Sequence, residues 1–188
     1  MKSRFEILAS LPVYGPMYIP VTESKNGFSS EGFVVRFHRV DGTDWVANFE
    51  KGWTRFNLVH EFPGYPNLLV VAGGRCYVMN PESTEPVAIF GIYYEGSLTL
   101  SDGRLILYDL TEITLVELNC QFKHSERISW DGIKEVSLKD GLVRGLAYDP
   151  IQDADDWKPF TLDISNFEIN GGSYLIGREV KKPWWKIW

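Results

Sequence analysis

The sequence contains little cysteine, no long hydrophobic run and no recognisable targeting segment. Its two cysteines, Cys76 and Cys120, are too few for a disulfide scaffold, and both lie in or beside strand-like segments. We interpret them as buried reduced thiols, although a bridge between them stays open. No apolar run approaches the roughly 18 residues of a membrane span, and Glu6 and Pro12 make the N-terminal segment a poor signal peptide. We therefore expect a cytoplasmic protein.

Motifs for catalysis, metal binding and phosphate binding are also missing. The three histidines, His38, His60 and His124, are far apart and none has the spacing of a metal site. The sequence has no P-loop and no Gly-x-Ser-x-Gly turn, so we predict no catalytic residues, no metal and no cofactor, and an enzyme is not favoured. The formal net charge of −6 argues against nucleic acid as a general partner, because phosphate binding needs a concentrated cationic face.

What the sequence does contain is a recurring pattern of two extended apolar runs separated by a glycine turn. Asn67 to Glu82 is centred on Gly73-Gly74, Ser97 to Leu110 on Asp102-Gly103, and Val136 to Tyr148 on Asp140-Gly141. Turns of this kind need positive φ, which glycine adopts without steric cost. The pattern predicts antiparallel β-hairpins. Further strands are predicted at 33–40, 44–49 and 160–164, which makes about ten to twelve in all. The alternation over 135–139 predicts a sheet with one apolar face, whereas the continuous apolar runs 68–72 and 105–108 predict strands buried on both faces.

The predicted fold class is therefore all-β, built from antiparallel β-meanders with few or no helices. The segment Ala72 to Phe90 resembles the strand, turn and strand of a propeller blade. A complete propeller has four to eight blades of roughly 40 residues each, so all but the smallest ring needs more than the 188 residues of this chain. We predict an incomplete propeller-like stack or a two-sheet sandwich in a single domain, 1–188. Residues 1–31, with prolines every four residues from Pro12, are predicted to be irregular.

Acidic residues gather near the start of the last predicted strands and form the first candidate binding site. The segment contains Asp149, Asp153, Asp155 and Asp156, followed by Trp157. Four carboxylates in a loop suit a hard cation or a basic protein surface, but the spacing of an EF-hand is missing. A basic partner is therefore favoured over a metal, and an acidic solvated loop with Trp157 packed under the sheet is the simpler alternative.

Two further candidate sites contain tryptophan. Trp130 and Asp131 come directly before a predicted strand, where packing and turn formation compete with stacking on a ligand. The C-terminal tail, 178–188, is basic and contains Trp184, Trp185 and Trp188. Such a tail suits packing over a sheet edge, a protein interface that includes self-association, or, less favoured, a membrane surface.

Three functions of different classes are compatible with these features. The leading hypothesis is a non-catalytic protein-interaction or binding module, such as an inhibitor or immunity-like protein acting on a basic partner. The second is a binder of carbohydrate or another small ligand that uses Trp130 or Trp157 as a stacking platform. The third is a hydrolase acting through carboxylates, which requires two acids converging in a cleft, at least one with a raised pKa.

Overall fold

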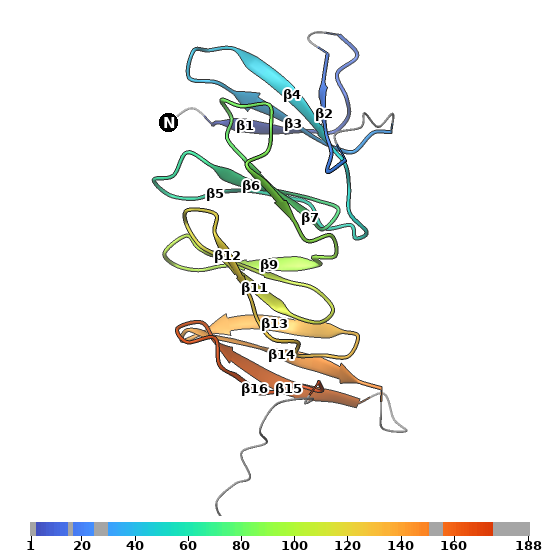
Figure 1. Cartoon of the computed structure of the whole chain (residues 1–188), viewed down its shortest axis with the longest axis vertical. Helices are drawn as coiled ribbons and strands as arrows, with labels where there is room; N and C mark the ends of the chain where they lie inside the picture. The colour runs from blue at the N-terminus through green and yellow to red at the C-terminus, as the bar shows by residue number, and fades with distance from the viewer. Residues whose placement is uncertain (1–2, 15–16, 25–29, 151–155, 175–188) are drawn as a thin grey trace, which may run out of the picture. The chain divides into compact units, whose positions relative to one another are not determined.

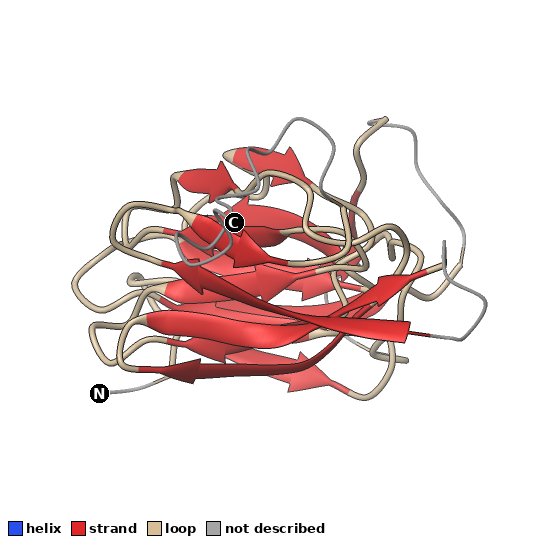
Figure 2. Ribbon diagram, turned by 90° about the horizontal axis from the view of Figure 1, so that it is seen from below, coloured by secondary structure: helices blue, strands red, loops and turns tan. Residues whose placement is uncertain are grey.

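The computed structural model describes residues 3–14, 17–24, 30–150 and 156–174, which form strands and loops with no helix (Figure 2). The described residues contain sixteen strands. This is more than the sequence predicted, because several short strands lie in segments between the predicted ones. They form four four-stranded sheets, and all pairs with a resolved register are antiparallel except one. The predicted all-β meander class is confirmed.

The first sheet departs from a simple meander. Its strands are β1 (Phe5–Leu8), β2 (Ile19–Val21), β3 (Phe33–His38) and β4 (Asp44–Phe49), in the order β1-β3-β4-β2. β2 pairs in parallel with β4, and both β1 and β2 are edge strands. An edge position tolerates Pro20, which has no N–H to donate. The prediction that residues 1–31 are irregular is therefore wrong for these two segments, because tertiary pairing supplies partners that a local pattern does not reveal.

The other three sheets have their strands in sequence order. The second contains β5 (Leu58–Glu61), β6 (Leu68–Ala72), β7 (Arg75–Met79) and β8 (Ala88–Phe90). The third contains β9 (Gly96–Thr99), β10 (Leu105–Tyr108), β11 (Ile113–Val116) and β12 (Phe122–His124). The fourth contains β13 (Ile133–Lys139), β14 (Leu142–Asp149), β15 (Asp156–Asp163) and β16 (Ile169–Gly171).

The glycine turns lie where the sequence predicts them. Gly73 and Gly74 have φ of 56° and 84° and connect β6 to β7, whose closing pair is Ala72 and Arg75. Asp140 and Gly141, with φ of 53° and 77°, connect β13 to β14 in the same way. Positive φ at both central positions matches the right-handed twist of the paired strands. All three predicted hairpins are confirmed.

The chain divides into two compact units, Met1–Tyr108 with Leu115–Lys123, and Asp109–Thr114 with His124–Trp188. The single-domain organisation stays a prediction. Among the described residues, no helix has the length and apolar character that a bilayer span requires.

In the first unit the β5–β8 sheet has apolar side chains on both faces, and each face contributes to its own core cluster. Leu68, Val70, Tyr77 and Met79 join side chains of the first sheet, which lies beside β5–β7 in Figure 1. The other face contributes Leu69, Val71, Cys76 and Val78 to a second cluster. In that cluster they pack with Leu105 and Leu107 of β10 and Val116 of β11. A strand covered on both faces reads as a continuous apolar run, which explains the sequence of β6.

In the second unit the β13–β16 sheet has one apolar face. Val143, Ala147, Phe160 and Leu162 are buried, whereas alternate residues of β13 are exposed. The predicted one-sided character of this sheet is confirmed. Its register shifts between Lys134 and Ser137, at a bulge where Glu135 has a φ of 55°.

Candidate functional site

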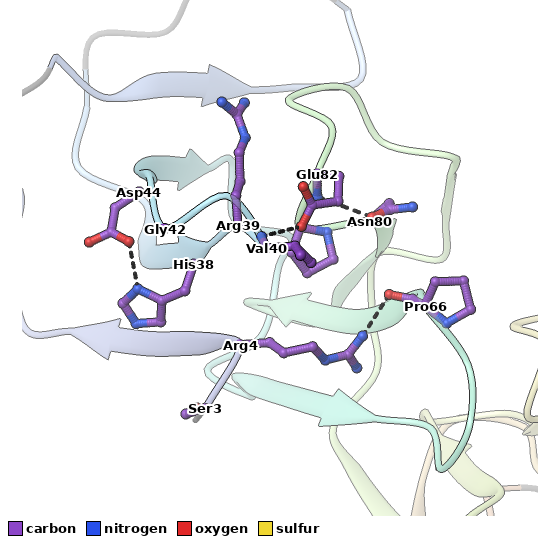
Figure 3. Close-up of a pocket in the computed structure, with 11 residues that line it drawn as sticks. Ser3, Arg4, His38, Arg39, Val40, Gly42, Asp44, Pro66, Asn80 and Glu82 are labelled. Atoms are coloured by element: carbon purple, nitrogen blue, oxygen red, sulfur yellow. Dashed lines mark hydrogen bonds and ion pairs between the residues drawn. The ribbon is translucent and has the colours of Figure 1, made fainter. Parts of the chain in front are cut away.

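A pocket of about 340 Å³ lies in the first unit, beside the turn between β3 and β4 (Figure 3). Its lining includes several ionisable side chains: Arg4, His38, Arg39, Asp44 and Glu82. Such a group would suit a polar ligand if its donors and acceptors were free. The pocket is therefore the first place to look for binding or catalysis.

Most of these polar groups already have partners within the protein. The guanidinium of Arg4 donates to Glu61 Oε1 at 2.9 Å and to the carbonyl oxygen of Pro66 at 2.8 Å. His38 Nδ1 lies 2.8 Å from Asp44 Oδ1, as Figure 3 shows. A ligand would have to replace these bonds at a cost in free energy. The contacts of Arg4 connect the start of the first sheet to β5 and to the segment around Pro66, whereas the His38–Asp44 pair joins β3 to β4 within the first sheet.

Arg39 is the exception among the charged groups of the pocket, because its Nε is buried and has no hydrogen-bond partner among the described residues. In Figure 3 its side chain points away from His38 and Arg4. Glu82, on the other side, accepts a hydrogen bond of 2.9 Å from the backbone N–H of Val40. The lining groups therefore do not converge on one ligand position.

A different surface of the first unit has the features of a binding site. Trp53 is 72% exposed and contacts Tyr93, which is 44% exposed, in an edge-to-face geometry with ring centroids 4.8 Å apart. Trp53 lies in the loop between β4 and β5, and the exposed cations Lys51 and Arg55 flank it. We call Lys51, Trp53, Arg55 and Tyr93 the Trp53 surface.

Backbone hydrogen bonds hold the loop of Trp53 against the glycine turn between β6 and β7. Trp53 N–H donates to the carbonyl of Ile92 at 3.0 Å, and Thr54 N–H donates to that of Gly73 at 2.9 Å. The Thr54 hydroxyl also donates to the carbonyl of Tyr94 at 2.7 Å. The two loops that carry Trp53 and Tyr93 are thus joined to each other and to a rigid turn.

Close approach of the backbones in this region leaves no space for additional side chains. A Cβ at Gly52 would lie 2.6 Å from the carbonyl oxygen of Gly73, and one at Gly74 would lie 2.7 Å from that of Tyr94. Glycine at these positions therefore permits the backbone contacts that fix the loops. The exposed aromatic pair is consequently presented in a defined geometry.

Sequence reasoning missed the Trp53 surface, although a weak signal was present. The segment Lys-Gly-Trp-Thr-Arg follows a predicted strand, and its alternation suggests one buried and one exposed side. An alternating segment with a central Trp is more typical of a strand with a buried ring. The folded structure shows that this Trp faces solvent.

The structure places the predicted acidic site partly in strands. Asp149 ends β14 and Asp156 begins β15, where the two are register partners, so they do not belong to a loop as expected. Asp156 pairs with Lys158, and this hydrogen bond lowers the pKa of Asp156. Asp153 and Asp155 lie outside the described residues. The described acids are thus partly neutralised within the protein.

The two predicted tryptophan platforms of the second unit are half-buried. Lys134 Nζ lies 3.8 Å from the ring centroid of Trp157, and the ring of Tyr148 is 5.3 Å away. Trp130 contacts Tyr174 edge-on at 4.6 Å. Protein groups therefore occupy part of each indole surface. Asp131 is exposed beside Trp130, two residues before β13. Trp184, Trp185 and Trp188 lie outside the described residues.

Glu112 provides the raised carboxyl pKa that the hydrolase hypothesis requires. Burial raises the pKa of Glu112, the charge of Asp109 raises it further, and His124 opposes the shift. His124 Nδ1, however, lies 3.0 Å from Glu112 and 2.9 Å from the Thr114 hydroxyl, so one nitrogen serves both groups. Asp109 accepts the backbone N–H of Thr111 at 2.6 Å. Both acids are engaged by neighbours rather than aimed at a substrate position.

A cluster of three or more residues suited to holding a metal ion does not occur in the part of the chain that the structure describes. Comparison of the chain with protein-family models and with curated protein sequences gives no match.

Both cysteines are free and buried in the first unit, which gives a testable prediction. Burial raises the pKa of Cys120 from 9.0 to about 11 and raises that of Cys76 well above its ordinary value. The thiolate is the reactive form, and at pH 8 this raised pKa keeps Cys120 almost entirely protonated. We expect both thiols of the folded protein to resist labelling by a disulfide reagent at that pH.

Absorbance at the wavelength of the released thiol measures the labelling rate, and the protein in denaturant is the control in which both cysteines react. The raised pKa of Cys120 also makes the free energy of unfolding depend on pH. The thiol ionises near pH 9.0 in the unfolded chain, whereas the pKa of folded Cys120 is about 11. Below pH 9.0 the contribution of Cys120 to the free energy of unfolding is therefore complete, and it is lost as the pH rises from 9.0 towards about 11. Fast labelling of the folded protein would contradict the buried-thiol assignment.

Proposed function

We propose that this protein is a non-catalytic protein-binding module and that the Trp53 surface contacts its partner. The observation that carries the proposal is the 72% exposure of Trp53 on a loop fixed by backbone hydrogen bonds. Tryptophan and tyrosine are the residue types most enriched at the energetic centres of protein interfaces. Exposing an indole to water has no benefit for folding, because burial would stabilise it.

The rigidity of the two loops supports binding in a second way. Association costs the conformational freedom of each side chain and loop that becomes ordered. Here the backbone of the Trp53 loop is already held by Ile92 and Gly73, and the ring is supported by Tyr93. Binding therefore orders little more than the flanking cations.

The other functions are less well supported. Protein contacts on Trp130 and Trp157 reduce the ring area open to a sugar, and the acids around Glu112 have protein partners. An inhibitor acting on a basic partner through the acidic segment stays a prediction, since 151–155 lie outside the described residues. A cytoplasmic location likewise stays a prediction.

The proposal is tested with the full chain as bait in native extract, followed by binding measurements with the purified partner. We expect Trp53→Ala to weaken the complex about 30-fold, corresponding to the about 2 kcal/mol of a hot-spot residue. Tyr93→Ala should act in the same direction, because Tyr93 supports the indole. Isothermal calorimetry provides the affinities.

Tyr65→Ala is the matched control, since Tyr65 is an exposed aromatic of the same unit at 41% exposure. It should leave the affinity unchanged. Circular dichroism of each variant separates loss of binding from loss of folding. A specific partner that binds Trp53→Ala as tightly as the wild type would refute the proposed surface.

A further inference from the structure

We infer that the Trp53 surface binds an acidic polypeptide segment of its partner. This inference rests on the proposed function and adds the chemistry of the ligand. It is unexpected from the chain as a whole, whose net charge of −6 favours basic partners. The local charge at the exposed aromatic pair has the opposite sign.

Two exposed cations flank Trp53 in the chain. Lys51 and Arg55 each stand two residues from Trp53, and two residues span at most about 7 Å. Both are exposed, and neither forms an ion pair with another described residue. The Trp53 surface therefore carries two cationic groups that an incoming carboxylate can reach.

Several other arginines of the first unit differ in this respect, although Arg39 likewise forms no ion pair with a described residue. Arg4 pairs with Glu61, Arg36 with Glu6, and Arg104 with Asp102, at 2.7 to 2.9 Å. In a chain with more acids than bases, pairing is the common outcome. Arg55 and Lys51 lack it where the aromatic ring is most exposed.

The carboxylates near Lys51 form no ion pair with the Trp53 surface. Glu31 lines a hollow together with Glu50 and Lys51 and is exposed, but it is not paired with Lys51. Glu50 directly precedes Lys51, yet its carboxylate is held by Arg75 at 2.6 Å. Glu95, two residues beyond Tyr93, takes part in an interaction within the protein. Arg55 can accept a carboxylate in a two-pronged geometry, and the indole can cover the aliphatic part of the same peptide.

An acidic peptide fits these features better than a nucleic acid. Strong binding to a polyphosphate requires several cations along a continuous track, because affinity rises with the number of phosphates neutralised. Two cations on an acidic protein do not form such a track. They match a short acidic segment whose apolar residues contact Trp53 and Tyr93.

The test is selection of peptides from a random displayed library by the immobilised full chain, with the Trp53→Ala variant used to remove peptides that bind elsewhere. We expect the enriched sequences to contain more Asp and Glu than Lys and Arg. Reversing both charges, by Lys51→Glu with Arg55→Glu, should reverse this preference. It should also weaken a wild-type-selected acidic peptide about tenfold, the effect of losing two exposed ion pairs.

Lys139→Glu with Arg144→Glu is the matched control, because both residues are exposed cations of the second unit and the net charge changes by the same amount. This variant should keep the acidic preference.

Neutral or basic peptides at the Trp53 surface, or an unchanged preference after charge reversal, would overturn the inference while leaving the proposed function intact. Tight binding of single-stranded oligothymidine that depends on Lys51 and Arg55 would overturn it in favour of nucleic acid. Selection of no peptide that requires Trp53 would also count against it, and loss of the native partner from Trp53→Ala tests the proposed function separately.

Discussion

Phe49→Ala should lower the free energy of unfolding by about 3–5 kcal/mol, the usual cost of removing a fully buried phenyl ring. Phe49 ends β4, is completely buried and contacts Tyr77 of β7 with ring centroids 5.0 Å apart. It also lies 6.2 Å from Phe37 in an edge-to-face geometry. The substitution thus leaves a cavity between the first sheet and the β5–β8 sheet. Chemical denaturation followed by tryptophan fluorescence measures the change.

Trp53→Ala is the informative comparison for this experiment. It removes a larger aromatic side chain, but one that is 72% exposed. We expect a loss below about 1 kcal/mol, since exposed positions contribute little to folding. A similar loss in both variants would mean that Trp53 is part of the folded core, and the proposed binding surface would then be wrong.

Gly74→Ala should also destabilise the protein strongly, by about 3–4 kcal/mol, and should reduce partner binding. Gly74 has a φ of 84°, which a side chain adopts only with strain. A Cβ there would lie 2.6 Å from the Thr54 hydroxyl and 2.7 Å from the carbonyl oxygen of Tyr94, so the loops must also move apart. Denaturation curves give the stability, and the affinity for the partner reports the displacement of Trp53 and Tyr93.

Gly42→Ala separates the two causes. Gly42 has nearly the same φ, 87°, but an added Cβ there meets no atom within 4 Å. We expect a cost of about 1 kcal/mol from backbone strain alone, with no change in partner binding. If the two substitutions had equal effects, steric contact of the new Cβ with the Thr54 and Tyr94 loops would not contribute to the destabilisation by Gly74→Ala.

These results would connect the core to the proposed function. The turn at Gly73 and Gly74 continues two core strands, β6 and β7, and its backbone also binds the Trp53 loop. A buried hairpin therefore holds the exposed aromatic pair in place. This arrangement places the binding residues on loops supported by a rigid scaffold, which is where binding residues commonly lie.

Local features were well predicted because they depend on few residues. The turns at Gly73-Gly74 and Asp140-Gly141 need positive φ, which the residue type alone indicates. The continuous apolar run of β6 predicted burial on both faces, and the two core clusters confirm it. The alternation in β13 predicted a one-sided sheet in the same way.

Features that depend on distant residues were not predicted. The parallel pairing of β2 with β4 joins segments separated by the whole of β3, and no local pattern specifies it. Asp149 and Asp156 were expected in a loop, but pairing of β14 with β15 extends to them. Burial of Glu112, and with it the raised pKa, likewise results from the surrounding chain.

The sequence by itself determined the β class, the glycine hairpins and the burial of the central strands, because backbone preference and alternation act over a few neighbouring residues. Tertiary structure alone decided which of the described tryptophans is most exposed to solvent. Trp53 is exposed on a loop that hydrogen bonds to the carbonyl groups of Ile92 and Gly73 hold in place, and the chain brings these partners together only on folding.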